Sequence, residues 1–200
     1  MELYPICDEE FKIEPNIWYS VTGNGESPFM RVGHTCIHVT DESNRGKLLF
    51  IGGANPSECF NDIYSLDLNN LNWDKFVDLA NFETGRYEHA CFKSDKSVFI
   101  FGGADQEKNY NDVISFDVNT NTCENFQISS STYPSARTFH AGITFKDKLI
   151  VFAGGETGKL AVQDSKIYIL DPIAKKWISL SPKGFFNLKF NQQYNLASFY

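Results

Sequence analysis

The chain has 200 residues, a formal net charge of −7 and a pI near 5.1, with 42% hydrophobic and 15% aromatic residues. The acidic balance argues against nucleic-acid binding, because phosphate contacts need clustered Lys and Arg. No apolar run reaches membrane-spanning length, so no transmembrane segment is expected. Five cysteines without a Cys-x-x-Cys motif argue against a disulfide framework and a structural zinc site. Together these features indicate a β-rich cytoplasmic protein.

The N-terminal part of the chain is predicted to lack a complete repeat unit. Residues 1–17 are acidic and irregular, and Asp8, Glu9 and Glu10 stand where a signal peptide would need apolar residues. Residues 18–30 are predicted to hold one short strand at 18–21, which begins at Trp18, and then a linker rich in Gly, Asn and Ser.

Residues 31–80 form the first of three similar units. An Arg-x-x-His motif opens a strand, and an apolar second strand at 48–51 runs into Gly52-Gly53. Asn61-Asp62 introduce a third strand at 63–68, and Trp73 marks a fourth. The glycines allow the backbone to turn through positive φ and allow neighbouring backbone to approach closely.

The same landmarks return in residues 86–130 and 137–180. Gly102 follows Gly52 by 50 residues, and Ala153 follows Gly102 by 51. A fixed period of this length, with four strands per unit, is typical of β-propeller blades. The predicted structural positions of the repeat are Arg31, His34, Gly52, Gly53, Asp62, Trp73, Arg86, His89, Gly102, Gly103, Asp112, Arg137, His140, Gly154, Asp164 and Trp177. Cys123 stands where the second unit should have its Trp.

The combination of Arg-x-x-His, apolar-Gly-Gly, Asn-Asp, Tyr-x-x-Asp and Trp resembles the kelch repeat over roughly residues 18–180. The resemblance implies an all-β, kelch-type β-propeller with about three four-stranded blades. The chain also resembles the kelch proteins that act as Rab effectors between late endosomes and the trans-Golgi. This resemblance rests on segments outside the general repeat pattern, such as Gly52-Gly53-Ala54-Asn55-Pro56, 134–140 and 162–164.

Three blades do not close a propeller ring, which typically has four to eight. The family that the chain resembles has about twice as many repeats, and the pattern stops after residue 180, leaving a divergent tail at 184–200. We therefore expect a truncated product with an incomplete ring. An end blade without a neighbour exposes apolar surface, which predicts self-association.

The repeated Arg and His are predicted to be structural, because each recurs in the same repeat context. Asp62, Asp112 and Asp164 are expected to end loops and accept backbone N–H bonds. No carboxylate pair has a catalytic spacing, and no cofactor motif is present. The sequence thus predicts no catalytic, metal-binding or cofactor-binding residue and no enzyme. Two alternatives stay open: arginines that line a channel for an acidic partner, and a metal-dependent kelch enzyme.

The loops between strands are the predicted interaction surface, since rigid scaffolds present function on loops. The loop at 156–163 differs most from its counterparts, which makes Glu156, Thr157, Lys159 and Gln163 the candidate partner-binding residues. The resemblance implies a non-catalytic effector that recognises a GTP-bound Rab GTPase together with other trafficking proteins. It would be cytoplasmic and peripheral on late-endosome or trans-Golgi membranes. A generic kelch adaptor, such as a ubiquitin-ligase substrate receptor, is the alternative.

Overall fold

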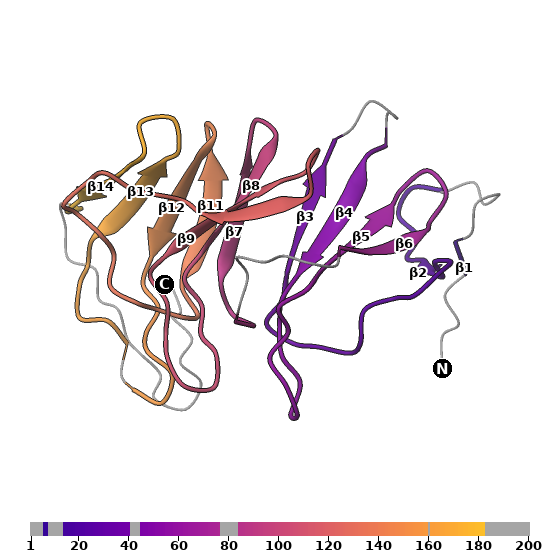
Figure 1. The fold of residues 1–200 in the computed structure, drawn as a ribbon, viewed down its shortest axis with the longest axis horizontal. Helices are drawn as coiled ribbons and strands as arrows, with labels where there is room; N and C mark the ends of the chain where they lie inside the picture. Colours follow the sequence, from indigo (N-terminus) through magenta and orange to yellow (C-terminus); the bar gives the residue numbers. More distant parts are fainter. Residues whose placement is uncertain (1–5, 8–13, 41–44, 77–83, 160, 183–200) are drawn as a thin grey trace.

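The structure is a computed structural model that describes residues 6–7, 14–40, 45–76, 84–159 and 161–182. These residues form only β-structure, in three four-stranded antiparallel sheets and one two-stranded parallel sheet (Figure 1). Within the same ranges no helix is long and apolar enough to cross a membrane. The predicted all-β fold is confirmed.

Each four-stranded sheet is one blade, and its strands are hydrogen-bonded in chain order. Blade 1 contains β3 (Thr35–Val39), β4 (Lys47–Ile51), β5 (Ile63–Asp67) and β6 (Trp73–Phe76). Blade 2 contains β7 (Ala90–Ser94), β8 (Ser97–Phe101), β9 (Val113–Asp117) and β10 (Thr122–Asn125). Blade 3 contains β11 (Ala141–Phe145), β12 (Lys148–Phe152), β13 (Ile167–Asp171) and β14 (Lys176–Leu180).

The turn between the third and fourth strands of a blade is closed by an aspartate. The Asp67 carboxylate accepts the Asn69 N–H at 2.8 Å, and the Asp117 carboxylate accepts those of Asn119 and Thr120 at 2.8 and 2.9 Å. A short acidic side chain can satisfy such turn N–H groups locally, which explains the aspartate of the Tyr-x-x-Asp pattern.

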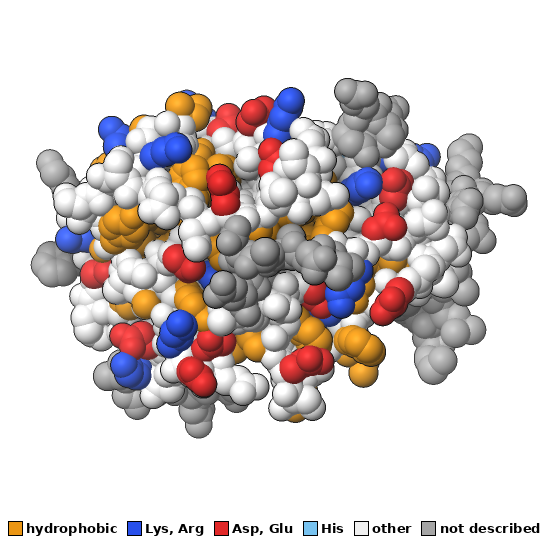
Figure 2. Space-filling view, in the orientation of Figure 1, with side chains coloured by type: hydrophobic (Ala, Val, Ile, Leu, Met, Phe, Trp, Pro, Cys, Tyr) orange, Lys and Arg blue, Asp and Glu red, His pale blue; other side chains and the backbone are white. Residues whose placement is uncertain are grey.

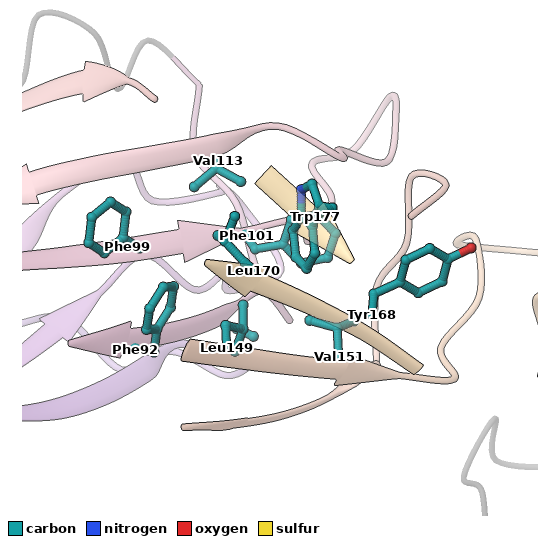
Figure 3. Packing of buried hydrophobic residues seen from close by; sticks show 10 residues of the cluster. Phe92, Phe99, Phe101, Val113, Leu149, Val151, Tyr168, Leu170 and Trp177 are labelled. Carbon is teal, nitrogen blue, oxygen red and sulfur yellow. The ribbon is translucent and has the colours of Figure 1, made fainter. Parts of the chain in front are cut away.

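The core lies between neighbouring blades. One buried cluster joins Leu49 and Ile51 of blade 1 to Val98 and Ile100 of blade 2. A second joins blade 2 to blade 3, where the aromatic rings of β7 and β8 face the aliphatic side chains of β12 and β13 and the indole of Trp177 (Figure 3). Fully burying an aliphatic or aromatic side chain of this size contributes about 1.5–3 kcal/mol. The blades are therefore stabilised chiefly by their neighbours.

The three blades stand side by side in chain order and leave the ring open (Figure 1). The innermost strands are β3, β7 and β11, and β7 contacts both of the others. The face of blade 3 directed away from blade 2 has no blade against it among the described residues. We call it the outer face of blade 3, and it carries the exposed side chains of Ile143, Phe145, Ile178 and Leu180.

The N-terminal segment differs in part from its prediction. Within the segment expected to be irregular, β1 (Ile6–Cys7) pairs in parallel with β2 (Ser20–Val21). Trp18 lies outside the strand and is 80% exposed. The divergent tail at 184–200 lies outside the described residues.

Candidate interaction surface

The arginine of each Arg-x-x-His motif is buried and bonded within its own blade. Arg86 Nη1 donates to the Gly102 carbonyl oxygen at 3.1 Å and to Asp112 Oδ1 at 2.9 Å. Arg137 donates in the same way to the Ala153 carbonyl oxygen at 3.0 Å and to Asp164 Oδ2 at 3.1 Å. In blade 1 the equivalent bonds join Arg31 to the Gly52 carbonyl oxygen and to Asp62.

This arrangement differs from the role expected of the aspartates. Asp62, Asp112 and Asp164 accept hydrogen bonds from guanidinium groups, whereas backbone N–H donors were predicted. The reason is burial, since the side chains of these arginines are only 0–3% exposed. A buried cation is costly unless a carboxylate compensates it.

Aromatic rings from the loops after the glycines cover two of these arginines. The Arg31 guanidinium carbon lies 3.9 Å from the Phe60 ring centroid, and that of Arg86 lies 4.4 Å from the Tyr110 ring centroid. A guanidinium over an aromatic face is a favourable cation–π contact. With carboxylate, carbonyl and ring contacts made internally, these guanidinium groups belong to the blade structure.

The histidines pack between blades, against the glycine pairs. A methyl group added at Gly52 would lie 3.2 Å from His89 Cε1, and one added at Gly102 would lie 3.0 Å from His140 Cε1. His89 Nε2 is hydrogen-bonded to Thr35 Oγ1 of the preceding blade at 2.8 Å. Both ring nitrogens of His140 are buried without a partner in the described part of the chain. His34 is exposed, and no preceding blade covers it among the described residues.

Burial decides the protonation of the two interior histidines. Desolvation, with the nearby Arg86 guanidinium, lowers the pKa of His89 to about 3. Desolvation and Arg137 lower the pKa of His140 to about 3. Both rings are therefore neutral near pH 7. Among the described residues, no group of three or more His, Cys, Asp or Glu side chains is placed to hold a metal ion.

The remaining repeat positions pack either between blades or within their own blade. Trp177 is buried, with its ring centroid 4.9 Å from that of Phe101 in blade 2, whereas Trp73 packs on Phe50 of its own blade at 5.0 Å. Cys123, which replaces the Trp in blade 2, is buried in the cluster between blades 1 and 2. Gly53, Gly103 and Gly154 adopt positive φ angles of 96°, 86° and 89°.

The candidate partner-binding loop is exposed and attached to blade 2. Thr157 donates from both its N–H and its Oγ1 to Asn109 Oδ1, at 3.1 Å each. The Lys159 ammonium and the Glu156 carboxylate form an ion pair at 2.5 Å, and their side chains are 69% and 41% exposed. Gln163 Nε2 donates to the Ala161 carbonyl oxygen at 3.1 Å. The loop thus presents Lys159 and Glu156 to solvent from a fixed base.

The visible surface has no block of a single charge sign, and acidic and basic side chains are interspersed with apolar ones (Figure 2). Exposed apolar residues gather at the two open ends of the blade row. At one end are Met30 and Val32, 91% and 74% exposed, and at the other are Phe139 and Ile143, 50% and 65% exposed. The sequence predicts an exposed flank but not these residues, because their exposure depends on how the blades pack against one another.

Comparison with known proteins agrees with this architecture. Residues 8–193 match the model of the KLHDC2/KLHL20/DRC7 Kelch-repeats domain. The chain is 38% identical over 183 residues to a Rab9 effector protein with kelch motifs from Xenopus laevis. The aligned region covers 88% of the chain and 49% of that protein. It is 36% identical to the protein of that name from Homo sapiens, covering 88% of the chain and 48% of the relative. The chain thus spans about half the length of these relatives.

Proposed function

Because the chain belongs to the kelch-repeat family, we propose that it is a non-catalytic scaffold that binds the GTP-bound form of a late-endosomal Rab GTPase. The observation that carries the proposal is the similarity to Rab9 effector proteins with kelch motifs over 88% of the chain. In this function the chain is cytoplasmic and peripheral on late-endosome or trans-Golgi membranes, and acts beside other trafficking proteins.

The geometry of the described residues supports a binding role over a catalytic one. The repeated Arg and Asp side chains, together with His89 and His140, are bonded or packed inside and between the blades. Groups that hold a scaffold together in this way are not free to act on a substrate. Exposed loops with fixed bases are the remaining surface on which a partner is recognised.

Within that surface we assign the first contact to the loop at 156–159. Lys159 is more exposed than its ion-pair partner Glu156, and the Thr157–Asn109 bonds hold the loop against blade 2. A preorganised loop loses little conformational entropy on binding. Of the two paired side chains Lys159 is the more exposed, so its ammonium group is the one we assign to an acidic group of the partner.

The test is a pull-down of the 200-residue chain with Rab9 loaded with GDP or with a non-hydrolysable GTP analogue. Selective capture of the GTP form is expected. Lys159→Glu reverses the charge at the loop tip and should weaken binding about tenfold, which corresponds to ~1.4 kcal/mol. The matched control is Lys166→Glu, an equally simple charge reversal at another exposed lysine of blade 3, and it should bind normally.

The outcomes separate the two parts of the proposal. A folded chain that captures neither nucleotide form overturns the effector assignment. Selective capture that Lys159→Glu leaves unchanged keeps the effector assignment and removes the loop from the contact.

A further inference from the structure

Two backbone hydrogen bonds recur at each contact between blades. The Gly53 N–H donates to the Arg86 carbonyl oxygen at 2.8 Å, and the Arg86 N–H donates back to the Phe60 carbonyl oxygen at 3.2 Å. Between blades 2 and 3, the Gly103 N–H donates to the Arg137 carbonyl oxygen at 2.9 Å, and the Arg137 N–H donates to the Tyr110 carbonyl oxygen at 3.0 Å. Each blade therefore offers one donor and one acceptor to the arginine of the next.

Blade 3 has the same donor and acceptor ready. The Val162 N–H donates to the Gly154 carbonyl oxygen at 2.9 Å, which is the turn that the Phe60 N–H and Gly53 carbonyl oxygen make in blade 1 at 2.8 Å. By this correspondence the Gly154 N–H and the Val162 carbonyl oxygen are the counterparts of the donor–acceptor pairs above. Neither group has a backbone partner in the described residues.

Blade 1 has the complementary groups at the opposite end of the row. Neither the N–H nor the carbonyl of Arg31 has a backbone partner among the described residues, although the equivalent groups of Arg86 and Arg137 are paired with the preceding blade. His34 is exposed, whereas His89 and His140 have buried rings at the same position. The backbone groups of Arg31 in blade 1 are thus available to bond to a preceding blade.

Blade 3 also has an exposed apolar surface at its open end. The outer face of blade 3 continues the series of faces that blades 1 and 2 bury, since Ile143 corresponds in register to Phe92 of β7 and to Ile37 of β3. It leaves Ile143, Phe145, Ile178 and Leu180 exposed by 65%, 59%, 39% and 48%.

The residues at one pair of positions differ from one contact between blades to the next, and this difference distinguishes the contacts. At the contact between blades 2 and 3, Thr138 Oγ1 bonds to Glu88 Oε2 at 2.5 Å. At the contact between blades 1 and 2, the same two positions hold Tyr87 and Gly33, where a methyl group on Gly33 would lie 3.1 Å from Tyr87 Cβ. The positions left open at the two ends are Phe139 and Val32, which are both apolar and 50% and 74% exposed.

From these observations we propose that the outer face of blade 3 binds blade 1 of a second copy of this chain, head to tail. Two copies related by a two-fold axis make both contacts at once and close a ring of six blades, within the usual range of four to eight. The curated relatives are about twice as long as this chain, so two copies also supply the length of one relative. Each copy contributes the donor–acceptor pair of Gly154 and Val162 and receives Arg31.

The one residue that resists this docking is Ala153. It replaces the first glycine of the pair, and methyl groups at the equivalent Gly52 and Gly102 would lie 2.5 and 3.0 Å from the carbonyl oxygen of the next arginine. The Ala153 methyl group therefore weakens the contact with Arg31 of the second copy. Ala153→Gly removes this crowding and should tighten the dimer at least threefold.

The first experiment measures the mass of the full chain by size-exclusion chromatography with light scattering between 1 and 100 µM. We expect a species of twice 22.7 kDa. Ile143→Asp, a substitution at an exposed position on the outer face of blade 3, should give a folded monomer with an unchanged circular dichroism spectrum. The controls are Ile173→Asp, at the 87% exposed tip of the β13–β14 turn, and Trp18→Ser, and both should remain dimers.

The second experiment tests the head-to-tail geometry. Val32→Glu and Phe139→Lys each place a charge against an apolar residue of the second copy, so each variant alone should be monomeric. In an equimolar mixture one contact pairs the two new charges and the other is unaltered. The mixture should therefore form dimers, because the new charges attract each other at one contact and the other contact is that of the original chain.

A folded chain that stays monomeric at 100 µM overturns the proposal and indicates that the outer face of blade 3 receives a blade of a longer polypeptide. A dimer that survives Ile143→Asp, or that Trp18→Ser abolishes, overturns it too, since the association would then use another surface. Failure of Val32→Glu and Phe139→Lys to combine excludes the head-to-tail arrangement.

Discussion

His89 and His140 occupy equivalent positions in successive blades, but their rings have different surroundings. His89 is bonded to Thr35, while the residue in the place of Thr35 for His140 is Ala90, which has no hydroxyl group. The buried ring nitrogens of His140 consequently have no partner in the described part of the chain, and its packing on Phe101 holds it in place at a centroid distance of 5.2 Å. One hydroxyl group thus separates a bonded histidine from an unbonded one.

These histidines predict a loss of stability in mild acid. Their pKa of about 3 in the folded chain is lower than that of an unfolded histidine, so the unfolded state binds more protons below about pH 6.5. The free energy of unfolding should therefore fall as the pH falls from about 6.5 towards 3. From pH 7 to 5 the loss is ~2 kcal/mol for each histidine, and urea unfolding at the two pH values measures it.

The control for this prediction is His140→Phe, which keeps the ring contact with Phe101 and removes the titrating group. Its loss of stability between pH 7 and 5 should be smaller by about half. An unchanged loss would contradict the assignment to buried histidines.

At the residue scale the sequence predicted which positions matter but not which atoms they meet. The period identified Arg86, His89 and Asp112, since each recurs in register. It did not predict that Asp112 bonds to Arg86, because an Asn-Asp pair before a strand equally fits a loop that satisfies its own backbone. The pairing depends on burial, which follows from the stacking of whole blades.

At the element scale, the glycine pairs connect one blade to the next. Gly102 has a φ of 67°, and a methyl group there would lie 3.0 Å from both the Arg137 carbonyl oxygen and His140 Cε1. At Ala153, with a similar φ of 59°, no described blade follows, so its methyl group is tolerated. The second glycine of each pair has positive φ in all three blades.

Gly102→Ala is therefore predicted to destabilise the chain by about 2 kcal/mol, through positive-φ strain and displacement of blade 3. Ala153→Gly is the matched change at the open position and should stabilise the monomeric Ile143→Asp background by only about 1 kcal/mol, because relief of positive-φ strain at Ala153 is the sole contribution there. Equal effects at the two sites, measured by thermal and urea unfolding, would show that the following blade is irrelevant to the requirement for glycine.

The strands themselves were largely predictable, because apolar runs such as that of β8 and the turn residues around them carry local signals. The solvent exposure of individual strand side chains was less predictable. Cys36 and Cys91 occupy the same position in β3 and β7, but Cys36 is exposed while Cys91 is half-buried. The difference comes from blade 1, which covers Cys91, whereas no described blade covers Cys36.

At the scale of the whole molecule, the described residues place a blade on both faces of blade 2 but on only one face of blades 1 and 3. Amide hydrogen exchange should therefore be slowest in β8 and β9 and faster in β11 and β14, whose side chains include the exposed outer face of blade 3. The measurement is exchange followed by mass spectrometry on the monomeric Ile143→Asp variant. Uniform protection across the three blades would instead indicate that they open only as one unit.

The sharing of each core between two blades has a consequence during synthesis on the ribosome. Blade 1 has all its strands once Phe76 has emerged, but the side chains that cover it are complete only at Asn125, about 50 residues later. At a synthesis rate of roughly 5–20 residues per second, the apolar face of blade 1 stays exposed to solvent for about 2–10 seconds. A nascent neighbour on the same messenger could offer the matching blade in that interval. The repetition that makes the blades interchangeable in the folded state thus creates a risk of wrong pairing while the chain is being made.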